Sequence, residues 1–453
     1  MANNNQVVGY LPDDRPPFWK LILYAIQQVI VMFPATVAVA LITGFHISTT
    51  IFASGLATLC FILVTKGQIP LYYGSSFSYI AAIGSLMASE ALSGYSLNEK
   101  IAIAQFGIVM SGLVSIAAGL IVNFFGRETI EKILPASITG PIAIIIGLSL
   151  AAVAMQDAAL INTSDFSQLE SNMAWIISLV TLISTIIFSI YLKGFWRQIP
   201  LLLGPLVGCI VALIIKAATG VDLFRSLPET ASTGIFALPT FTLPIPNLRA
   251  ALAIMPIAIA TIPESTAHIF QLDVYVNDLA KKKGAKRYPL AEKLGLNLIG
   301  DGIGDIVAGM IGGPAGTNYG ENISAMAITK VFSVPVLIAA SLLAMVISCF
   351  TPLINAIYSL PLPVIGGLEI YLFGAIAVQG IAIMIDRNVD MFSAKDIAVI
   401  ATILIIGLGG SFSPFFAEGI PFFGIYVPAI AGAAIFGILL NLGLSISEWR
   451  KRE

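Results

Sequence analysis

Charged residues are scarce in this sequence. Only 11% of its 453 residues are Asp, Glu, Lys or Arg, whereas an ordinary soluble domain carries about a quarter. The net charge of −2 says nothing about nucleic acid; the basic clusters are interpreted as topology anchors rather than binding patches, and no nucleic-acid partner is expected. With 57% apolar residues and a mean hydropathy of +0.94, the chain is predicted to reside in a lipid bilayer.

Cysteine and histidine are also rare. The three cysteines, Cys60, Cys209 and Cys349, lie in apolar stretches, so a disulfide framework is not expected. The sequence shows no His-rich metal cluster, nucleophile elbow or phosphate loop, and we predict no enzyme activity, no metal and no cofactor. A cleavable signal peptide is not expected, because the start MANNNQVVGYLPDDRPP has no apolar core.

Long apolar runs fill most of the chain. A spanning helix needs roughly 20 mostly apolar residues. Fourteen segments are predicted, at about 18–42, 48–65, 77–90, 101–122, 137–155, 174–192, 200–217, 250–270, 294–312, 322–331, 333–357, 365–384, 396–411 and 424–446. The third and the tenth are too short to span.

The basic residues predict the orientation. With the N-terminus inside, 19 of the 23 Lys and Arg residues (23 − 4) lie on the cytoplasmic side, as positive charge usually does. The four outside are Lys100, Lys216, Arg225 and Arg249. We therefore predict a multi-pass protein of the cell membrane with cytoplasmic N- and C-termini.

Two short motifs recur at matching places. YGSSFS at Tyr73 and YGENIS at Tyr319 each open the third segment of a run of seven, while LPASITG at Leu134 and LPLPVIG at Leu360 start the fifth and the twelfth. Because seven is odd, two such halves insert with opposite orientation, as in many secondary transporters. The predicted fold is an all-α integral membrane protein with 14 transmembrane segments in a 7+7 inverted repeat.

The chain before each short segment is rich in Pro, Gly and Tyr, as PLYYGSS and GGPAGTNYG. Non-helical backbone at membrane depth is tolerated only where it is buried in protein or lines a wet cavity. We expect short extended pieces before half-helices 3 and 10, meeting near the bilayer centre. The free N–H groups of the half-helices favour oxygen-rich ligands; a packing role alone is the alternative.

Five acidic residues lie within apolar segments: Glu264, Asp301, Asp305, Glu321 and Glu369. A charge at the centre of a spanning helix costs roughly 2.5–3.5 kcal/mol, so each is a functional candidate. Glu321 opens the tenth segment, as a ligand acceptor or as a helix cap. Glu264 and His268 are four residues apart and share a helix face, as a proton-coupling pair or as a structural one.

The other three acids carry weaker expectations. Asp301 and Asp305, in GDGIGDIVAG, also share a face. For Asp301, a supporting role and direct coupling stay equally open, and Asp305 is expected to serve helix packing or to face a loop. Glu369, in GGLEIYLFG, is assigned no role.

These groups together predict a class of solute. Two carboxylates accept hydrogen bonds and two half-helix ends donate them, while Phe77, Tyr319 and Phe373 offer flat faces for stacking. This set complements a small, planar, neutral ring with alternating N–H and C=O groups, such as a nucleobase. An anion fits poorly, because no Arg or Lys lies in the inferred core.

The chain resembles the nucleobase-cation symporters, also called nucleobase-ascorbate transporters, and in particular the bacterial uracil permeases. The resemblance runs from YAIQQVIVMFPAT through LYYGSSFSYI, PESTAHIF and TNYGENISAMAITK to SLPLPVIGG. The most specific match is the family signature around ENISAMAITK, which ends in Thr329 and Lys330.

The resemblance implies two domains and a homodimer formed through the second of them. A core (transport) domain would comprise 18–132 and 250–358, and a gate domain 133–217 and 359–446. A cytoplasmic tail at 1–17, an extracellular loop at 218–249 and a second tail at 447–453 complete the chain.

The resemblance also implies the site. Glu264 and Glu321 would accept hydrogen bonds from the substrate, and the backbone N–H groups of Phe77 and Gly320 would donate them. His268 would partner Glu264. Ser76 and Tyr319 belong to the same two stretches and are expected to contact the substrate.

Three positions depart from the family pattern and are expected to tune specificity. Ser324 stands where the signature has Gly, Gln28 replaces a first-segment His, and Phe373 replaces a Tyr of the twelfth segment. Asp301, within GDG, is more similar to the purine-transporting members.

The expected function is uracil import by proton symport with alternating access at a midplane site. A purine such as xanthine or uric acid is the alternative substrate, and sodium the less favoured coupling ion. An anion transporter of the same architecture is a remote alternative.

Overall fold

The computed structural model describes residues 9–126, 134–160, 168–228, 234–416, 419–422 and 425–449. Parts of the predicted tails, of the loop at 218–249 and of the domains around 127–133 and 161–167 therefore lie outside the described residues.

The fold is almost entirely helical. Its helices are α1 (Phe18–Thr43), α2 (Ile47–Val64), α3 (Ile80–Ala88), α4 (Leu97–Phe125), α6 (Ala136–Ser149), α7 (Ala151–Ala159), α8 (Gln168–Tyr191), α9 (Pro200–Thr219), α10 (Leu248–Ile254), α11 (Ala258–Lys283), α12 (Leu294–Ile311), α13 (Gly320–Thr329), α14 (Val334–Ile347), α15 (Thr351–Tyr358), α16 (Leu362–Asp386), α17 (Ala394–Phe412) and α18 (Ala429–Trp449).

Each of the fourteen predicted segments coincides with helix, but three boundaries were wrong. The eighth does not end near 270, because α11 continues to Lys283. The eleventh is broken between α14 and α15, where Pro352 follows the break. The fourteenth begins at Ala429, since β3 (Ile420–Phe422) and β4 (Ile425–Val427) form an unpredicted antiparallel hairpin before it.

Length and apolarity mark the membrane spans. Among the described residues, ten helices are long and apolar enough to cross a membrane, and Phe77–Ala88, Val334–Ile347 and Ala429–Ser445 are shorter apolar helices. The first of these shorter helices includes the 3₁₀ turn Phe77–Tyr79 before α3. The chain is therefore a multi-pass helical membrane protein.

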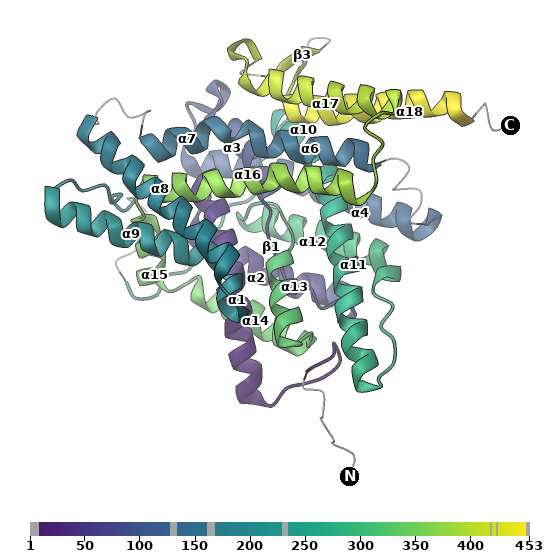
Figure 1. Cartoon of the computed structure of the whole chain (residues 1–453), viewed down its shortest axis with the longest axis horizontal. Coiled ribbons are helices and arrows are strands. Elements are labelled where there is room, and N and C mark those ends of the chain that lie inside the picture. The colour runs from purple at the N-terminus through teal and green to yellow at the C-terminus, as the bar shows by residue number, and fades with distance from the viewer. Residues whose placement is uncertain are drawn as a thin grey trace.

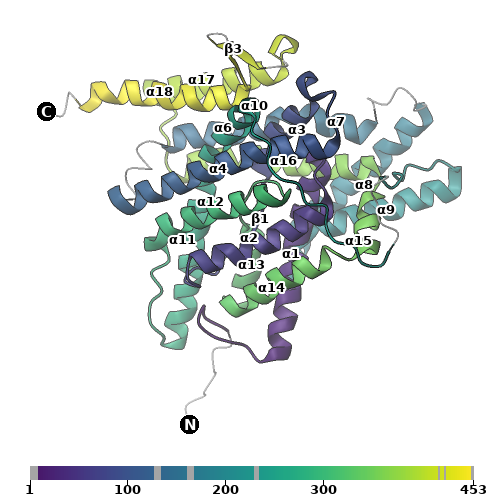
Figure 2. The ribbon, with the colours of Figure 1, turned by 180° about the vertical axis from the view of Figure 1, so that it is seen from behind.

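The helices pack in two sets. In the first, α4 packs on α12, α2 on α12 and α14, and α1 on α14. In the second, α16 packs on α6, α7 and α8, and α17 lies between α6 and α18. Figures 1 and 2 show α17 and α18 along one edge of the molecule, with the N-terminal end of the described chain at the opposite edge.

The two predicted extended pieces pair with each other. Strand β1 (Tyr73–Ser75) runs antiparallel to β2 (Gly316–Asn318), with Gly74 opposite Thr317. All six residues are buried, so this ribbon satisfies its backbone polar groups inside the protein. Each strand leads into a short helix, α3 or α13, which confirms the predicted extended pieces before the short helices.

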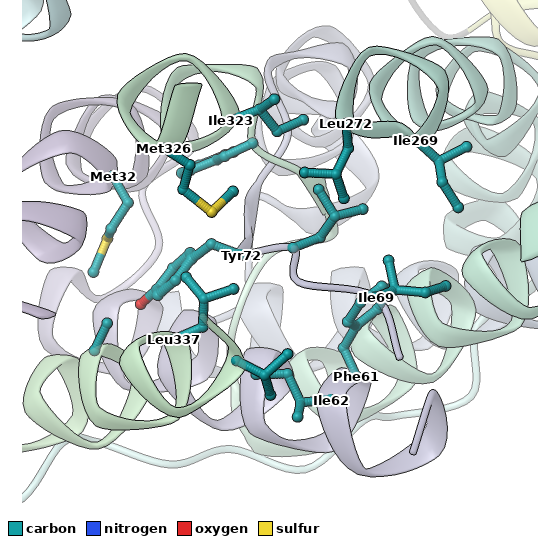
Figure 3. Close-up of a cluster of buried hydrophobic side chains, with 14 of the residues drawn as sticks. Met32, Phe61, Ile62, Ile69, Tyr72, Ile269, Leu272, Ile323, Met326 and Leu337 are labelled. Atoms are coloured by element: carbon teal, nitrogen blue, oxygen red, sulfur yellow. The ribbon is translucent and has the colours of Figure 1, made fainter. Parts of the chain in front are cut away.

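A large apolar core lies behind this ribbon. Figure 3 shows one buried cluster that contains Tyr72, which directly precedes β1, together with Ile323 and Met326 of α13 and Ile269 and Leu272 of α11. All five side chains are buried. Because both helices bury one face in this core, their opposite faces are held in a fixed relation to each other.

The N-terminal segment ties the ends of the same two helices. The Tyr10 N–H donates to Lys330 O at 2.8 Å, just after α13, and Lys283 at the end of α11 pairs with Asp14 at 3.0 Å. Burial and the neighbouring Asp13 raise the pKa of Tyr288 to about 12, so its phenol stays protonated and donates to Asp13 at 3.1 Å.

Candidate functional site

The paired strands hold Tyr319 in one orientation. A Cβ on Gly74 would overlap the Tyr319 ring, so only glycine leaves room for the ring to cross β1. The Tyr319 hydroxyl donates to Ser75 O at 2.9 Å and lies 2.9 Å from Thr36 Oγ1. Tyr319 is therefore fixed by β1 and α1 at the entry of α13.

Asp305 of α12 joins the two strands. One carboxylate oxygen accepts from the Tyr73 hydroxyl of β1 at 2.5 Å and from the Gly316 N–H of β2 at 2.8 Å. Asp305 is 1% exposed. The expectation that it serves packing or faces a loop was incomplete, because this carboxylate is the acceptor that connects both strands.

Replacing Asp305 by Ala is expected to destabilise the protein by about 2–6 kcal/mol, because two buried donors then lose their acceptor at about 1–3 kcal/mol each. Asp305→Asn is the matched control, since its amide oxygen can still accept from both donors. Thermal unfolding in detergent measures the difference. An Asp305→Ala protein that melts with the wild type would exclude the proposed strand connection.

A cavity of about 660 Å³ lies beside the ribbon, within the size range of small-molecule sites. Its walls come from β1 and the 3₁₀ turn after it, from β2, and from α9, α11, α13 and α16. The α11 residues that line it follow helical spacing and form one stripe: Glu264, His268, Gln271 and Tyr275. From α13 come Gly320, Glu321, Ser324, Ala327 and Ile328, and from α16 Tyr371, Leu372, Ala375, Ile376 and Gln379.

The two acids predicted as a pair line this one cavity. Glu264 lies on α11 and Glu321 in the first turn of α13, and each carboxylate is within electrostatic reach of the other. The first amides of a helix have no acceptor within it, and the N-cap residue of α13, Tyr319, makes no side-chain capping hydrogen bond. The cavity therefore presents two acceptors beside the backbone N–H groups of the first turn of α13.

Further polar atoms at the cavity lack partners. Among the described residues, His268 Nδ1, Thr317 Oγ1 and Asn318 Oδ1 are buried without a hydrogen-bond partner, and all three side chains line the cavity. The His268 ring also packs against Gly320. Unpaired buried polar atoms cost free energy, so a polar ligand or water at this site would relieve the cost.

Asp301 lies next to the cavity rather than in its wall. It accepts from Ser265, the residue after Glu264, and Ser265 Oγ in turn accepts from Asn297 at 2.7 Å and from Asn318 at 3.2 Å. Asp301 is 5% exposed. This network connects α12 and β2 to the α11 turn that carries Glu264.

The remaining predicted residues divide into two groups. Ser76, Phe77, Tyr319 and Ser324 line the cavity, whereas Gln28 and Phe373 are not in its wall. Asn322 Nδ2 donates to Gln28 Oε1 at 2.8 Å, so Gln28 anchors α13 to α1. Phe373 is 2% exposed and belongs to the second apolar core.

Sequence reasoning missed Tyr371 and Arg197. The hydroxyl of Tyr371, two residues before Phe373, lies 2.8 Å from Ser189 Oγ, and the side chain faces the cavity. Arg197, in the 3₁₀ turn Gly194–Gln198, lines the cavity at an exposed position. The expectation that no Arg or Lys reaches the site was therefore wrong, because Arg197 lies at the exposed border of the cavity. The aromatic side chain of Tyr371 was the feature of the sequence from which this residue could have been predicted.

Comparison with known proteins agrees with the polar cavity. A family model described as a permease family matches residues 19–416. The chain is 34% identical to the uracil permease of Bacillus caldolyticus over 436 residues, covering 95% of this chain and 93% of that protein. It is 33% identical to the uracil permease of Bacillus subtilis (strain 168), with the same coverage.

A solved structure shares the fold. The transmembrane domain of a cyanobacterial bicarbonate transporter, BicA, superposes with a TM-score of 0.57 at 14% identity. The match covers 95% of this chain and 98% of that domain. At this identity the likeness concerns the arrangement of helices alone.

Proposed function

Because this chain belongs to the permease family, as a nucleobase-cation symporter (nucleobase-ascorbate transporter) similar to the bacterial uracil permeases, we propose that it imports uracil by proton symport. The observation that carries the proposal is the placement of Glu264 and Glu321 on one cavity beside the open N-terminus of α13. Similarity to uracil permeases supports the choice of uracil over other solutes.

The chemistry of the pocket matches that of the ring. Uracil is a planar ring that carries two N–H donors and two carbonyl acceptors along its edge. In the proposed complex, Glu264 and Glu321 accept from the N–H groups, and the backbone N–H groups of Phe77 and Gly320 donate to the carbonyls. Phe77 and Tyr371 supply aromatic surface at the wall.

Proton coupling is assigned to Glu264 and His268. The two side chains face the cavity from successive turns of α11, so the occupant of the cavity changes the surroundings of both. Two carboxylates close together repel each other in a site of low dielectric. Protonation near Glu264 would remove that repulsion and permit binding, and loss of the proton towards the cytoplasm would favour release.

The proposed transport cycle is alternating access, and the packing of the helices in two sets supports it. In the proposed 14-segment, 7+7 inverted-repeat architecture, the core domain at 18–132 and 250–358 moves against the gate domain at 133–217 and 359–446. The cavity wall includes α11 and α13 from the core and α16 from the gate. Relative movement of the domains would therefore open the wall on alternate sides, and the gate domain is the proposed homodimer contact.

The mouth of the cavity indicates its direction. The α11 stripe runs from Glu264 towards Tyr275 and the basic end at Lys281, and exposed Arg197 and Gln379 border the cavity. With the proposed cytoplasmic termini, these basic residues lie on the cytoplasmic side. The conformation is then open to the inside.

Uptake of labelled uracil into proteoliposomes tests the function. A gradient of one pH unit, about 1.4 kcal/mol, is expected to support up to about tenfold accumulation for one proton per uracil. Collapsing the gradient should abolish accumulation, and xanthine should compete poorly. If the protein bound xanthine but took up no uracil, the proposed substrate would become a purine, in agreement with the acid at Asp301. Accumulation driven by a sodium gradient alone would refute proton coupling.

A further inference from the structure

Glu369 of α16 is a buried acid that the proposed transport mechanism does not use. Its side chain is 0% exposed. Among the residues that the structure describes, neither Oε1 nor Oε2 has a hydrogen-bond partner. A buried carboxylate without a donor or a counter-charge is strongly unfavourable, so some further group must satisfy these two oxygens.

The neighbour of Glu369 is another acid, Asp157 of α7. The carboxyls of Asp157 and Glu369 face each other at hydrogen-bonding range. Helices α7 and α16 approach closely here, because a Cβ on Gly366 would overlap the backbone nitrogen of Ala158. Glu369 is one turn beyond Gly366 on the same face of α16, so backbone contact holds the two carboxyls together.

The charges around the pair do not neutralise both acids. Arg225 acts on Asp157 but not on Glu369, and it also lies near Tyr358. Helix α6 has no titratable residue, and α8 meets α16 at Ser178 and carries an acid, Glu170, in its first turn. Lys216, the charged residue of α9, pairs with Asp222 at 2.6 Å. Within the part of the chain that the structure describes, Arg225 is therefore the one cation that acts on the two facing carboxylates.

One proton resolves both problems. Two ionised carboxylates have no hydrogen to place between them, whereas a protonated acid donates to its ionised partner and satisfies an oxygen on each side. One negative charge also disappears, and the remaining one can be balanced by Arg225. A pair of this kind titrates as a unit.

We propose that Asp157 and Glu369 form a second proton-binding site, which holds one shared proton between α7 and α16. The site is separate from Glu264 and His268. Glu369 precedes Leu372 and Ile376 on one face of α16, and both of these line the cavity. The shared proton thus lies one helical turn before Leu372 along α16, in the direction away from Gln379.

Infrared spectroscopy of the full-length protein in liposomes at neutral pH tests the site through the C=O stretch of protonated carboxyls. Glu369→Gln is expected to remove the signal of one protonated carboxyl per chain, because the remaining Asp157 is ionised beside Arg225 and accepts from the new amide. Asp157→Asn is expected to keep that signal, because Glu369 is fully buried and Arg225 does not act on it. Its frequency should shift in this variant, since Glu369 then donates to a neutral amide oxygen in place of a carboxylate. Asp222→Asn, at an exposed and already paired acid, is the matched control and should leave the signal unchanged.

Retention of the signal in Glu369→Gln would overturn the shared proton. A band at unchanged frequency in Asp157→Asn would also overturn it, because the protonated carboxyl would then have no contact with position 157. The outcome does not depend on the transported solute: a protein that fails to bind uracil would refute the proposed function and leave this result standing, and the reverse also holds. Using two variants separates loss of the proton from misfolding of one protein.

Discussion

Uracil affinity is expected to fall roughly 10-fold to 150-fold when Glu321 is replaced by Gln. The carboxylate at the start of α13 faces the cavity and accepts a charge-assisted hydrogen bond from the ring in the proposed complex. Such bonds contribute about 1.5–3 kcal/mol, and each 1.4 kcal/mol is a factor of ten in Kd. Isothermal titration of purified protein with uracil measures the change.

The matched control is Glu292→Gln, because Glu292 is a surface acid whose partner is Arg287 at 3.7 Å. The same chemical change at that position should leave uracil affinity unaltered. Wild-type affinity in the Glu321→Gln protein would contradict the assigned role. That result would favour an anion carrier of the same architecture, for which a carboxylate at the site has no use.

Replacing Glu264 by Gln is expected to lower proton-driven uracil uptake at least about 100-fold. Glutamine keeps the shape and one acceptor oxygen but cannot take up a proton. Proton transfer by a positioned side chain commonly contributes about 10²–10⁴-fold to a rate. The initial rate of uptake in proteoliposomes, measured across a range of outside pH, should also lose its pH dependence.

Exchange of internal for external uracil gives the second readout for Glu264→Gln. Exchange needs binding and domain movement but no net proton transfer, so it is expected to retain more of its rate than uptake does. Equal loss of both activities would mean that Glu264 acts in binding or folding alone. Unchanged pH-dependent uptake would assign proton coupling to another group, with His268 as the next candidate.

Much of the site was predictable because its signals are local. A carboxylate in an apolar helix is costly wherever that helix packs, so Glu264 and Glu321 stood out in the sequence. Pro and Gly before a short apolar run interrupt a helix whatever its neighbours are, and the structure confirms extended chain before both α3 and α13. The ranges of most long helices followed from apolar length in the same way.

Other features depended on contacts between distant segments. Asp305 connects β1 with β2 only because the two strands meet in one register. Tyr371 lines the cavity while Phe373 does not, since two residues along a helix correspond to about 200° of rotation. A sequence pattern does not show which face of α16 meets α6 and which meets the cavity.

The sequence by itself determined the class of protein, because low charge and long apolar runs indicate a membrane protein. It also marked the acids within those runs as functional candidates. Only the tertiary structure decided which acids lie together. Glu264 joins Glu321 at the cavity, while Glu369 joins Asp157 between α7 and α16. The physical reason is that the free-energy cost of burying a charge depends on the residue itself and can be read from the sequence. The partner that offsets this cost depends on how the helices pack.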